Sequence, residues 1–158
     1  MLVLTERVES THLHSHTLTL AFELRQKARF KTRSDSGETI GVMLPRGRVL
    51  RGGDCLQSED GAVTVRVIAA LEEVSLACCD DKLLLAKASY HLGNRHMPLQ
   101  IEEGCLVYQK DHVLDEMVRN LGLSVSHEMR SFEPEPGAYG DHAHPHDSAH
   151  DPVRSRVS

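Results

Sequence analysis

The hydrophobic pattern of the chain changes near residue 71, and this change limits what the chain can fold into. Before that point, apolar and polar residues alternate in short runs, separated by turn-forming segments at 34–37, 45–47, 52–54 and 60–61. Short alternating runs between turns predict β-strands that bury one face. We therefore expect a small all-β domain over residues 1–71.

Residues after 71 combine strand-like alternation with helical spacing. Asp80 and Asp81 can cap a helix, because a side-chain oxygen there can accept a hydrogen bond from a free backbone amide, and Gly93 is the expected helix stop. Asp111 and Gly122 bracket a second helix in the same way. The sequence therefore predicts two helices in this half of the chain.

Strand candidates flank these helices. They lie at 74–78, 99–101, 106–108 and 124–132. The resulting order is β-α-β-β-α-β, in which both helices can cover one face of a four-stranded sheet. The sequence therefore predicts a ferredoxin-like domain over residues 72–133 and an α+β fold for the chain as a whole.

The composition changes again after residue 133, where Pro, Gly, Asp and His dominate and aliphatic residues nearly disappear. Such a segment cannot bury enough apolar surface to offset its ordering, so we predict that residues 134–158 are disordered. Neutral imidazole binds Zn, Cu, Fe and Ni, and a flexible tract can wrap any of them. The tail is therefore predicted to bind metal through His142, His144, His146 and His150.

Histidine is the unusual residue of this sequence, with 11 copies in 158 residues. The alternation from residue 12 to 22 places His12, His14 and His16 on one face of a presumed strand, close enough for neighbouring imidazoles to share an ion. These three are candidate additional metal ligands. The alternative is three partly exposed histidines at a fraying strand start.

The segment YHLGNRH, at 90–96, ends in a histidine that follows the expected helix stop and precedes a new apolar run. Such a junction would present His96 from a loop held by two packed elements. One histidine is only one ligand, but in a two-fold homodimer a residue near the axis meets its own copy. His91 and His112 are further candidate ligands. A structural hydrogen-bonding role is the alternative for each of the three.

The sequence argues against several other classes of protein. It carries no HExxH motif, zinc-deaminase motif or Gly-rich phosphate loop, so we predict no catalytic residues and no enzyme activity. A net charge of −5 argues against nucleic acid as a partner. No apolar run is long enough for a membrane span or a signal peptide, so we expect a cytoplasmic protein. The four cysteines lack CxxC spacing and are expected to be reduced.

One stretch is strongly basic. The alternation there places five basic side chains on one face of a presumed strand: Arg25, Lys27, Arg29, Lys31 and Arg33. Such a face could bind an acidic partner, or it could simply be the solvated side of the strand.

Several motifs carry a resemblance to a known family. They are LPRGRVLRGGDCL at 44–56, YHLGNRHMPLQI at 90–101, DHVLDEMVRNLGL at 111–123 and FEPEPGAYG at 132–140, followed by the His-rich tail. With them the chain resembles the UreE-type urease accessory proteins, which are the nickel metallochaperones of urease maturation. The resemblance implies a peptide-binding-like first domain and a ferredoxin-like dimerisation domain.

The resemblance also implies a site and partners. His96 matches the histidine that, from each subunit, binds nickel at the dimer interface, and the tail would supply further ligands. The implied partners are the urease accessory GTPase and, through it, the urease apoprotein complex. Lys110 stands where some members of the family carry another histidine. This chain therefore lacks that histidine as a partner for His112 in a second metal site.

We therefore expect a homodimeric nickel carrier that binds Ni²⁺ through paired His96 residues and delivers it to apo-urease. Zn²⁺ and Cu²⁺ should bind as well, since a nitrogen-rich site binds Cu²⁺ at least as tightly as Ni²⁺. Binding should weaken as the pH falls through about 6.5, where free imidazole is protonated. The competing hypotheses are a metal storage or sensing protein without a delivery role, and a metal-dependent enzyme.

Overall fold

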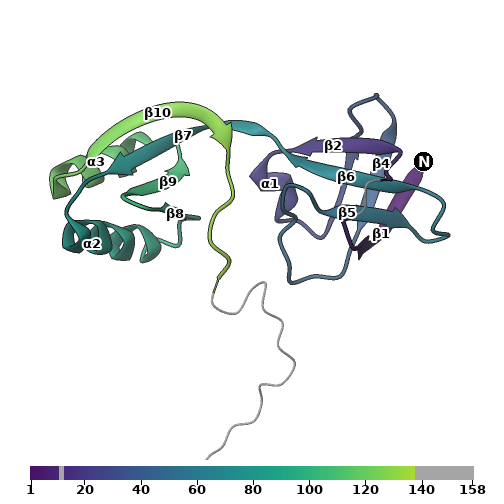
Figure 1. Ribbon diagram of the computed structural model, residues 1–158, viewed down its shortest axis with the longest axis horizontal. Helices are drawn as coiled ribbons and strands as arrows, with labels where there is room; N and C mark the ends of the chain where they lie inside the picture. Colours follow the sequence, from purple (N-terminus) through teal and green to yellow (C-terminus); the bar gives the residue numbers. More distant parts are fainter. Residues whose placement is uncertain (11–12, 138–158) are drawn as a thin grey trace, which may run out of the picture.

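The computed structural model describes residues 1–10 and 13–137, which form two domains lying side by side (Figure 1). The strands of the first domain are β1 (Leu2–Val8), β2 (His16–Leu20), β3 (Arg29–Arg33), β4 (Thr39–Met43), β5 (Cys55–Ser58) and β6 (Thr64–Ala69). They form one six-stranded sheet in the order β2-β6-β5-β1-β4-β3. Its core is aliphatic and includes Leu4, Leu18, Ile40, Val42, Leu56, Val65 and Val67.

The turn predicted at 34–37 is confirmed, and it joins two paired strands. Strand β3 pairs with β4 in antiparallel register from Arg29 opposite Met43 to Arg33 opposite Thr39. Gly37 in the connecting turn has a φ of 96°, a left-handed conformation that glycine adopts without the steric penalty of a side chain.

The strand predicted from residue 12 to 22 is wrong at both ends. Strand β2 begins only at His16, and after it the chain forms one helical turn, α1 (Phe22–Arg25). The turn replaces the strand because Phe22 is buried against the second domain and its backbone N–H donates to the carboxylate of Glu72 at 2.7 Å. Tertiary contacts therefore outweigh the local alternation.

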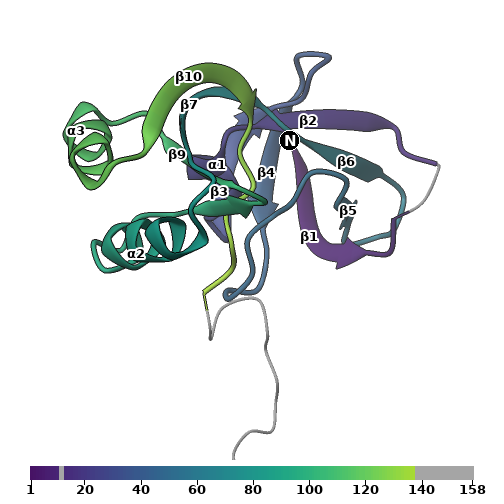
Figure 2. The same cartoon turned by 60° about the vertical axis from the view of Figure 1, so that its left-hand side comes forward.

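The second domain contains β7 (Leu71–Cys78), α2 (Lys82–Gly93), β8 (Gln100–Glu102), β9 (Cys105–Gln109), α3 (His112–Leu121) and β10 (Ser124–Ser131). The four strands form an antiparallel sheet in the order β10-β7-β9-β8. Helices α2 and α3 lie on one side of this sheet (Figure 2) and share a core of Ala77, Ala88, Leu92, Leu106, Tyr108, Leu114 and Val118. The chain is thus a mixed α/β protein of two domains. None of the helices in its described part is long and apolar enough to cross a membrane.

Three of the four expected helix ends are found where the sequence placed them. The carboxylates of Asp81 and Asp111 each accept two backbone N–H groups in the first turns of α2 and α3. Gly122 ends α3 in the left-handed conformation, with a φ of 112°. Gly93, by contrast, is the last residue of α2, and Asn94 follows it with a helical φ of −66°. The left-handed residue in this connection is His96 instead.

Cys78 and Cys105 form a disulfide, so the prediction of four reduced cysteines is wrong for this pair. The two residues lie opposite each other in the register of β7 and β9, with their Cα atoms 4.2 Å apart. Sequence spacing does not reveal this proximity, because 27 residues and a helix separate the two positions. Cys55 and Cys79 are free thiols.

Arg25 lies at the boundary between the domains and is fully buried, so its expected place on an exposed basic strand is wrong. Its guanidinium donates to the backbone oxygens of Leu20 and Leu50, at 3.1 Å each, and to that of Phe132. It also forms an ion pair with Glu133 at 2.9 Å. A buried cation with this many acceptors fixes the position of α1 between the two domains (Figures 1 and 2).

The predicted disorder from residue 134 does not hold for residues 134–137. Pro134 is buried, and the backbone N–H of Glu135 donates to the oxygen of Leu99 at 2.8 Å. These residues therefore run along the second domain without forming a helix or strand. The remaining tail positions, including His142, His144, His146 and His150, lie outside the described residues.

Candidate metal centre

His96 lies in the short connection between α2 and β8. Its backbone N–H donates to the oxygen of Gly93 at 2.9 Å, and that of Arg95 donates to the oxygen of Leu92 at 3.1 Å. His96 has a φ of 59° and is the only non-glycine residue with positive φ among the described residues. Such a conformation is uncommon for residues with a side chain and often marks a functional position.

The side chain of His96 is exposed. Its imidazole forms no hydrogen bond or ion pair with any residue in 1–10 or 13–137, so both ring nitrogens face solvent or the adjacent cavity. The connection that holds it is anchored on both sides by buried residues, Leu92 and Leu99. This arrangement can present one nitrogen ligand from a well-defined backbone.

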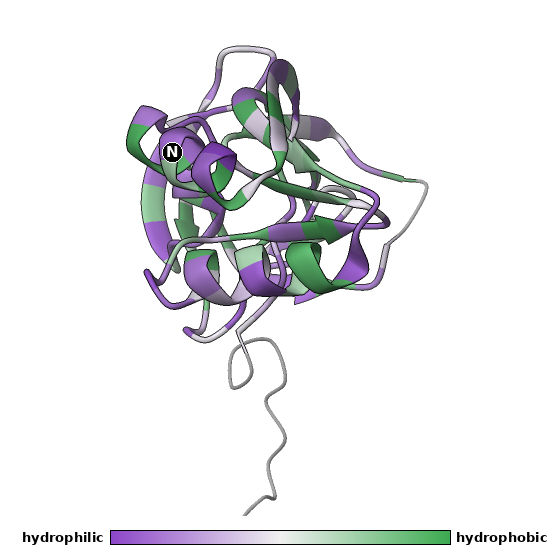
Figure 3. Ribbon diagram, turned by 90° about the vertical axis from the view of Figure 1, so that its left-hand side faces the viewer, coloured by the Kyte–Doolittle hydropathy of each residue, from purple (hydrophilic) through white to green (hydrophobic). Residues whose placement is uncertain are grey.

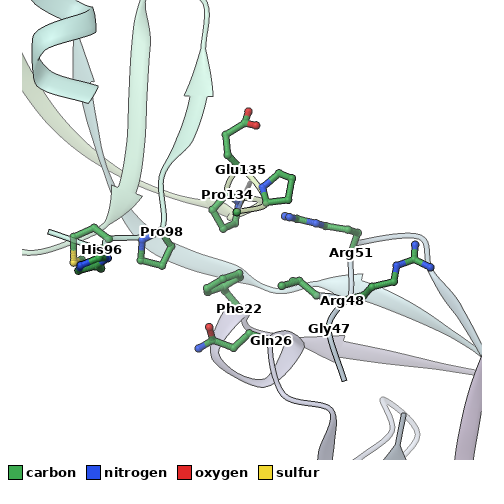
Figure 4. A pocket seen from close by; sticks show the side chains of 13 residues that line it. Phe22, Gln26, Gly47, Arg48, Arg51, His96, Pro98, Pro134 and Glu135 are labelled. Carbon is green, nitrogen blue, oxygen red and sulfur yellow. The ribbon is translucent and has the colours of Figure 1, made fainter. Parts of the chain in front are cut away.

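A cavity of about 430 Å³ lies beside His96 at the boundary between the domains (Figure 4). His96, Met97 and Pro98 form one side of it. The side that belongs to the first domain is formed by Phe22, Gln26, residues 47–49 and Arg51, and the segment 134–137 completes the cavity. The histidine loop, the first domain and the segment leading into the tail therefore meet in one place.

The other predicted histidines of the folded part do not join His96. His91 is exposed on the last turn of α2, and its ring packs edge-to-face against Tyr90 with centroids 5.4 Å apart. His112 is exposed in the first turn of α3.

The strand face expected to carry three histidines is not formed. His14 is exposed and lies outside β2, while the ring of His16 lies 3.4 Å from the carboxylate of Glu38 and 3.4 Å from the hydroxyl of Ser36. His12 lies outside the described residues. Across 1–10 and 13–137, no three or more His, Cys, Asp or Glu side chains are grouped to hold a metal ion.

A cluster that sequence reasoning missed lies under the helices. The carboxylate of Asp115 accepts a hydrogen bond from the hydroxyl of Tyr108 at 2.7 Å and lies 2.7 Å from Nε2 of His127. Burial opposes ionisation of Asp115, but the neighbouring Ser75, Tyr108 and His127 outweigh it, so the pKa of this carboxyl lies below its ordinary value. Burial, and then the carboxylate, raise the pKa of Tyr108 above its ordinary value.

The position of Asp115 in the helix is the signal that could have revealed the cluster. Asp115 directly follows Leu114 and precedes Val118 by three residues, so it lies on the apolar side of α3. A carboxylate there must find partners inside the protein. Tyr108 on β9 and His127 on β10, the two strands that flank β7 in the sheet, supply them.

Of the basic residues predicted to bind a partner, Arg29, Lys31 and Arg33 project from exposed positions of β3. Lys27 is exposed just before this strand, whereas Arg25 is buried, as described above. The exposed basic surface therefore contains four of the five predicted residues. Arg46 and Arg48, which follow β4 in the chain, line the same cavity as Lys27 and Arg29 and extend this surface.

Comparison with known proteins identifies the family. The family model described as the N-terminal domain of the UreE urease accessory protein matches residues 4–70, and the model for the C-terminal domain matches residues 72–154. The urease accessory protein UreE of Alkalilimnicola ehrlichii is 59% identical over 140 residues, which cover 89% of this chain and 85% of that protein.

Two other relatives cover nearly their full length. The urease accessory protein UreE of Citrobacter koseri is 51% identical over 150 residues, and that of Escherichia coli O157:H7 is 49% identical over 152 residues. Each alignment spans 95% of this chain and 99% of the relative. The resemblance inferred from the sequence motifs is thereby confirmed, and the chain belongs to the UreE family of urease accessory proteins.

Proposed function

We propose that this protein is a nickel metallochaperone of urease maturation, in which His96 from each of two subunits holds Ni²⁺ at a homodimer interface. The observation that carries the proposal is the exposed imidazole of His96, which forms no hydrogen bond with the described residues and is presented by a left-handed residue between two buried anchors. One rigid ligand per chain suits a site that a two-fold axis completes. Two imidazoles leave coordination positions open, as an ion carrier needs.

The domains have different roles in this proposal. Residues 1–71 form a partner-binding domain, residues 72–133 a ferredoxin-like metal-binding and dimerisation domain, and residues 134–158 a metal-binding tail. The strand order β10-β7-β9-β8, with both helices on one face, supports the ferredoxin-like assignment. The His127–Asp115–Tyr108 cluster is structural here, because it ties α3 to the sheet.

The surface of the second domain supports a homodimer. Leu83 and Tyr90 on α2 and Val113 on α3 are each more than 60% exposed. In the view onto this domain, hydrophobic residues alternate with hydrophilic ones along the helices (Figure 3). A second protein packed against α2 and α3 would bury these side chains. We propose that the partner is a second copy of the chain.

Delivery completes the proposed function. The tail histidines and His112 capture Ni²⁺, with His91, His12, His14 and His16 as additional ligands. The ion then passes to the paired His96 site, and from there to the urease apoprotein complex through the accessory GTPase. The protein acts in the cytoplasm without catalysing a reaction. Zn²⁺ and Cu²⁺ bind the same nitrogen ligands, so selectivity for nickel comes from the partner and from metal availability.

Calorimetric nickel titration tests the site. The chain stopped after Gly140 should keep its tightest site, His96→Ala in that chain should lose it, and His91→Ala, a nearby exposed histidine, should keep it. A tight site that survived His96→Ala would rule out the mechanism. A transfer assay with apo-urease and the GTPase then separates delivery from storage, since a storage protein would bind nickel but activate no urease.

A further inference from the structure

Two neighbouring cavities share lining residues at the edge of the first domain, and one of them reaches His96. The first is the cavity of about 430 Å³ beside His96, and the second, of about 400 Å³, lies along the start of β3 and the segment 46–48. They share Gln26, Gly47 and Arg48. We call the combined lining of the two cavities, from Arg29 through Arg48 to His96, the basic groove.

The charges along the basic groove have one sign over most of its length. Lys27, Arg29, Arg46 and Arg48 are all exposed, and none of them forms an ion pair with a carboxylate of the described residues. By contrast, other arginines of the chain are paired, such as Arg7 with Asp54 and Arg130 with Glu102. Four neighbouring cations without counter-charges are unexpected in a chain whose net charge is −5.

The far end of the groove, beside His96, has a different character. Arg51 pairs with Glu133 at 3.6 Å and extends toward Pro134, while the carboxylate of Glu135 points away from the cavity (Figure 4). The remaining walls there are apolar and come from Phe22, Val49, Met97, Pro98 and Pro134. An acidic ligand would therefore be held along the first domain and would end at the imidazole.

The walls of the groove are fixed before any ligand arrives. The backbone oxygen of Arg48 accepts a hydrogen bond from the guanidinium of Arg7 at 2.8 Å, and that guanidinium is held in turn by Asp54 at 2.9 Å. The backbone N–H of Leu44 donates to Ala28 at 2.8 Å, which ties the two sides of the second cavity together. A preformed site loses less conformational entropy on binding than a flexible one.

We propose that the basic groove binds an extended acidic segment of a partner protein, whose carboxylates pair with Arg46, Arg48, Arg29 and Lys27 and whose end lies beside His96. Guanidinium groups bind carboxylates through two parallel hydrogen bonds, which favours such a ligand. This inference rests on the proposed nickel site and specifies it further: a carboxylate at the end of the groove offers oxygen ligands to the ion on His96.

Nucleic acid is a weaker candidate for the same groove. A long polyanion would meet the repulsion of the net negative chain beyond this patch. Binding of single strands also relies on exposed aromatic side chains for stacking, and Phe22, the aromatic residue of the groove, is buried. The chemistry on this surface therefore favours carboxylates carried by a protein.

A binding assay with the full-length chain tests the proposal. The probe is a short fluorescein-labelled peptide of alternating Asp and Glu, measured by fluorescence anisotropy in nickel-free buffer at low salt. Arg46→Ala/Arg48→Ala should weaken binding by about tenfold or more, because two charge-assisted contacts are removed. The matched control, Lys31→Ala/Arg33→Ala, removes the same charge from exposed positions of β3 outside the groove and should change affinity by less than about twofold.

Several results would overturn the proposal: no binding to the wild-type chain, equal losses in the two double variants, or equal binding of a Ser/Gln peptide of the same length. Tighter binding of a single-stranded oligonucleotide with the same sensitivity to Arg46→Ala/Arg48→Ala would make nucleic acid the ligand. A changed sedimentation coefficient of that variant would indicate that the groove contacts a second copy. Nickel titration of the same variant should be unchanged, so a failure here is distinguishable from a failure of the His96 site.

Discussion

The guanidinium of Arg25 and the carboxylate of Glu133 lie 2.9 Å apart across the boundary between the two domains. The other oxygen of Glu133 accepts the backbone N–H of Gly52 at 2.9 Å, so this one side chain ties the end of β10 to two parts of the first domain. Phe22 and Phe132 pack edge-to-face beside the pair, with centroids 5.5 Å apart. The two domains are therefore held together by an ion pair, a hydrogen bond and aromatic packing as well as by the covalent chain.

Arg25→Ala should destabilise the protein strongly. It removes the hydrogen bonds that Arg25 donates to three backbone oxygens and to the partly buried Glu133, and breaking a buried ion pair costs about 3 kcal/mol. Urea denaturation measures the change in the free energy of unfolding. Arg33→Ala, on the exposed strand β3, is the control and should change it by less than about 0.5 kcal/mol. Similar values for the two variants would show that the junction contributes nothing to stability.

The pair Cys78–Cys105 should stabilise the oxidised protein by about 3 kcal/mol, because the cross-link restricts a loop of 27 residues in the unfolded chain. Unfolding with and without a thiol reductant measures this difference. In Cys78→Ala/Cys105→Ala the reductant should have no effect, whereas in Cys55→Ala it should act as in the wild type. In a reducing environment the same facing residues are expected as thiols. Insensitivity of the wild type to reductant would contradict the disulfide.

Asp115 should make the stability of the second domain depend on pH. Its folded-state pKa is depressed, so the stabilisation is fully present above the unfolded pKa, near about 4, and is lost as the pH falls through the lower folded value. Asp115→Asn should cost about 1–2 kcal/mol at neutral pH, because the hydrogen bonds with Tyr108 and His127 are weakened. The difference from the wild type should shrink in acid.

Thermal unfolding across this pH range provides the measurement for Asp115. Glu116→Gln, an exposed neighbour on α3, is the matched control and should shift the unfolding temperature little at any pH. If the difference in unfolding temperature between Asp115→Asn and the wild type stayed constant down to the lowest pH, the ionised carboxylate would not be the source of the stabilisation.

Local signals in the sequence predicted local structure well. Asp81, Asp111 and Gly122 mark helix ends because capping depends on backbone groups within a few residues. The β3–β4 hairpin follows for the same reason. The motif around His96 was specific enough to indicate the family, and the alternation patterns located most strands of both domains.

Features that depend on contacts between distant segments escaped prediction. The burial of Arg25 depends on Glu133, which lies 108 residues away, and the pairing of Cys78 with Cys105 depends on the order of the strands. Gly93 was misread because the helical hydrogen bonding continues past it, from the N–H of Asn94 to the oxygen of Tyr90. The reversal in chain direction therefore falls on His96, three residues later.

The backbone of His96 leads to the sharpest prediction about the site. At a φ of 59° a glycine avoids the steric penalty that a side chain incurs, so His96→Gly should leave stability unchanged or raise it by up to about 1 kcal/mol. The same substitution should abolish the tight nickel site. Asn94→Gly is the matched control: its φ of −66° is helical, so glycine there should cost about 0.5–1 kcal/mol and leave nickel binding intact.

Urea denaturation and nickel calorimetry on these two variants separate structure from function. If His96→Gly kept or raised the free energy of unfolding but lost nickel binding, the imidazole would be the reason why the chain keeps an unfavourable backbone conformation at this position. Such retention of function at the expense of stability is common at functional sites. If His96→Gly destabilised the protein as much as Asn94→Gly, the histidine would be a structural residue of the loop. A metal-binding role for it would then have no support from the conformation of its backbone.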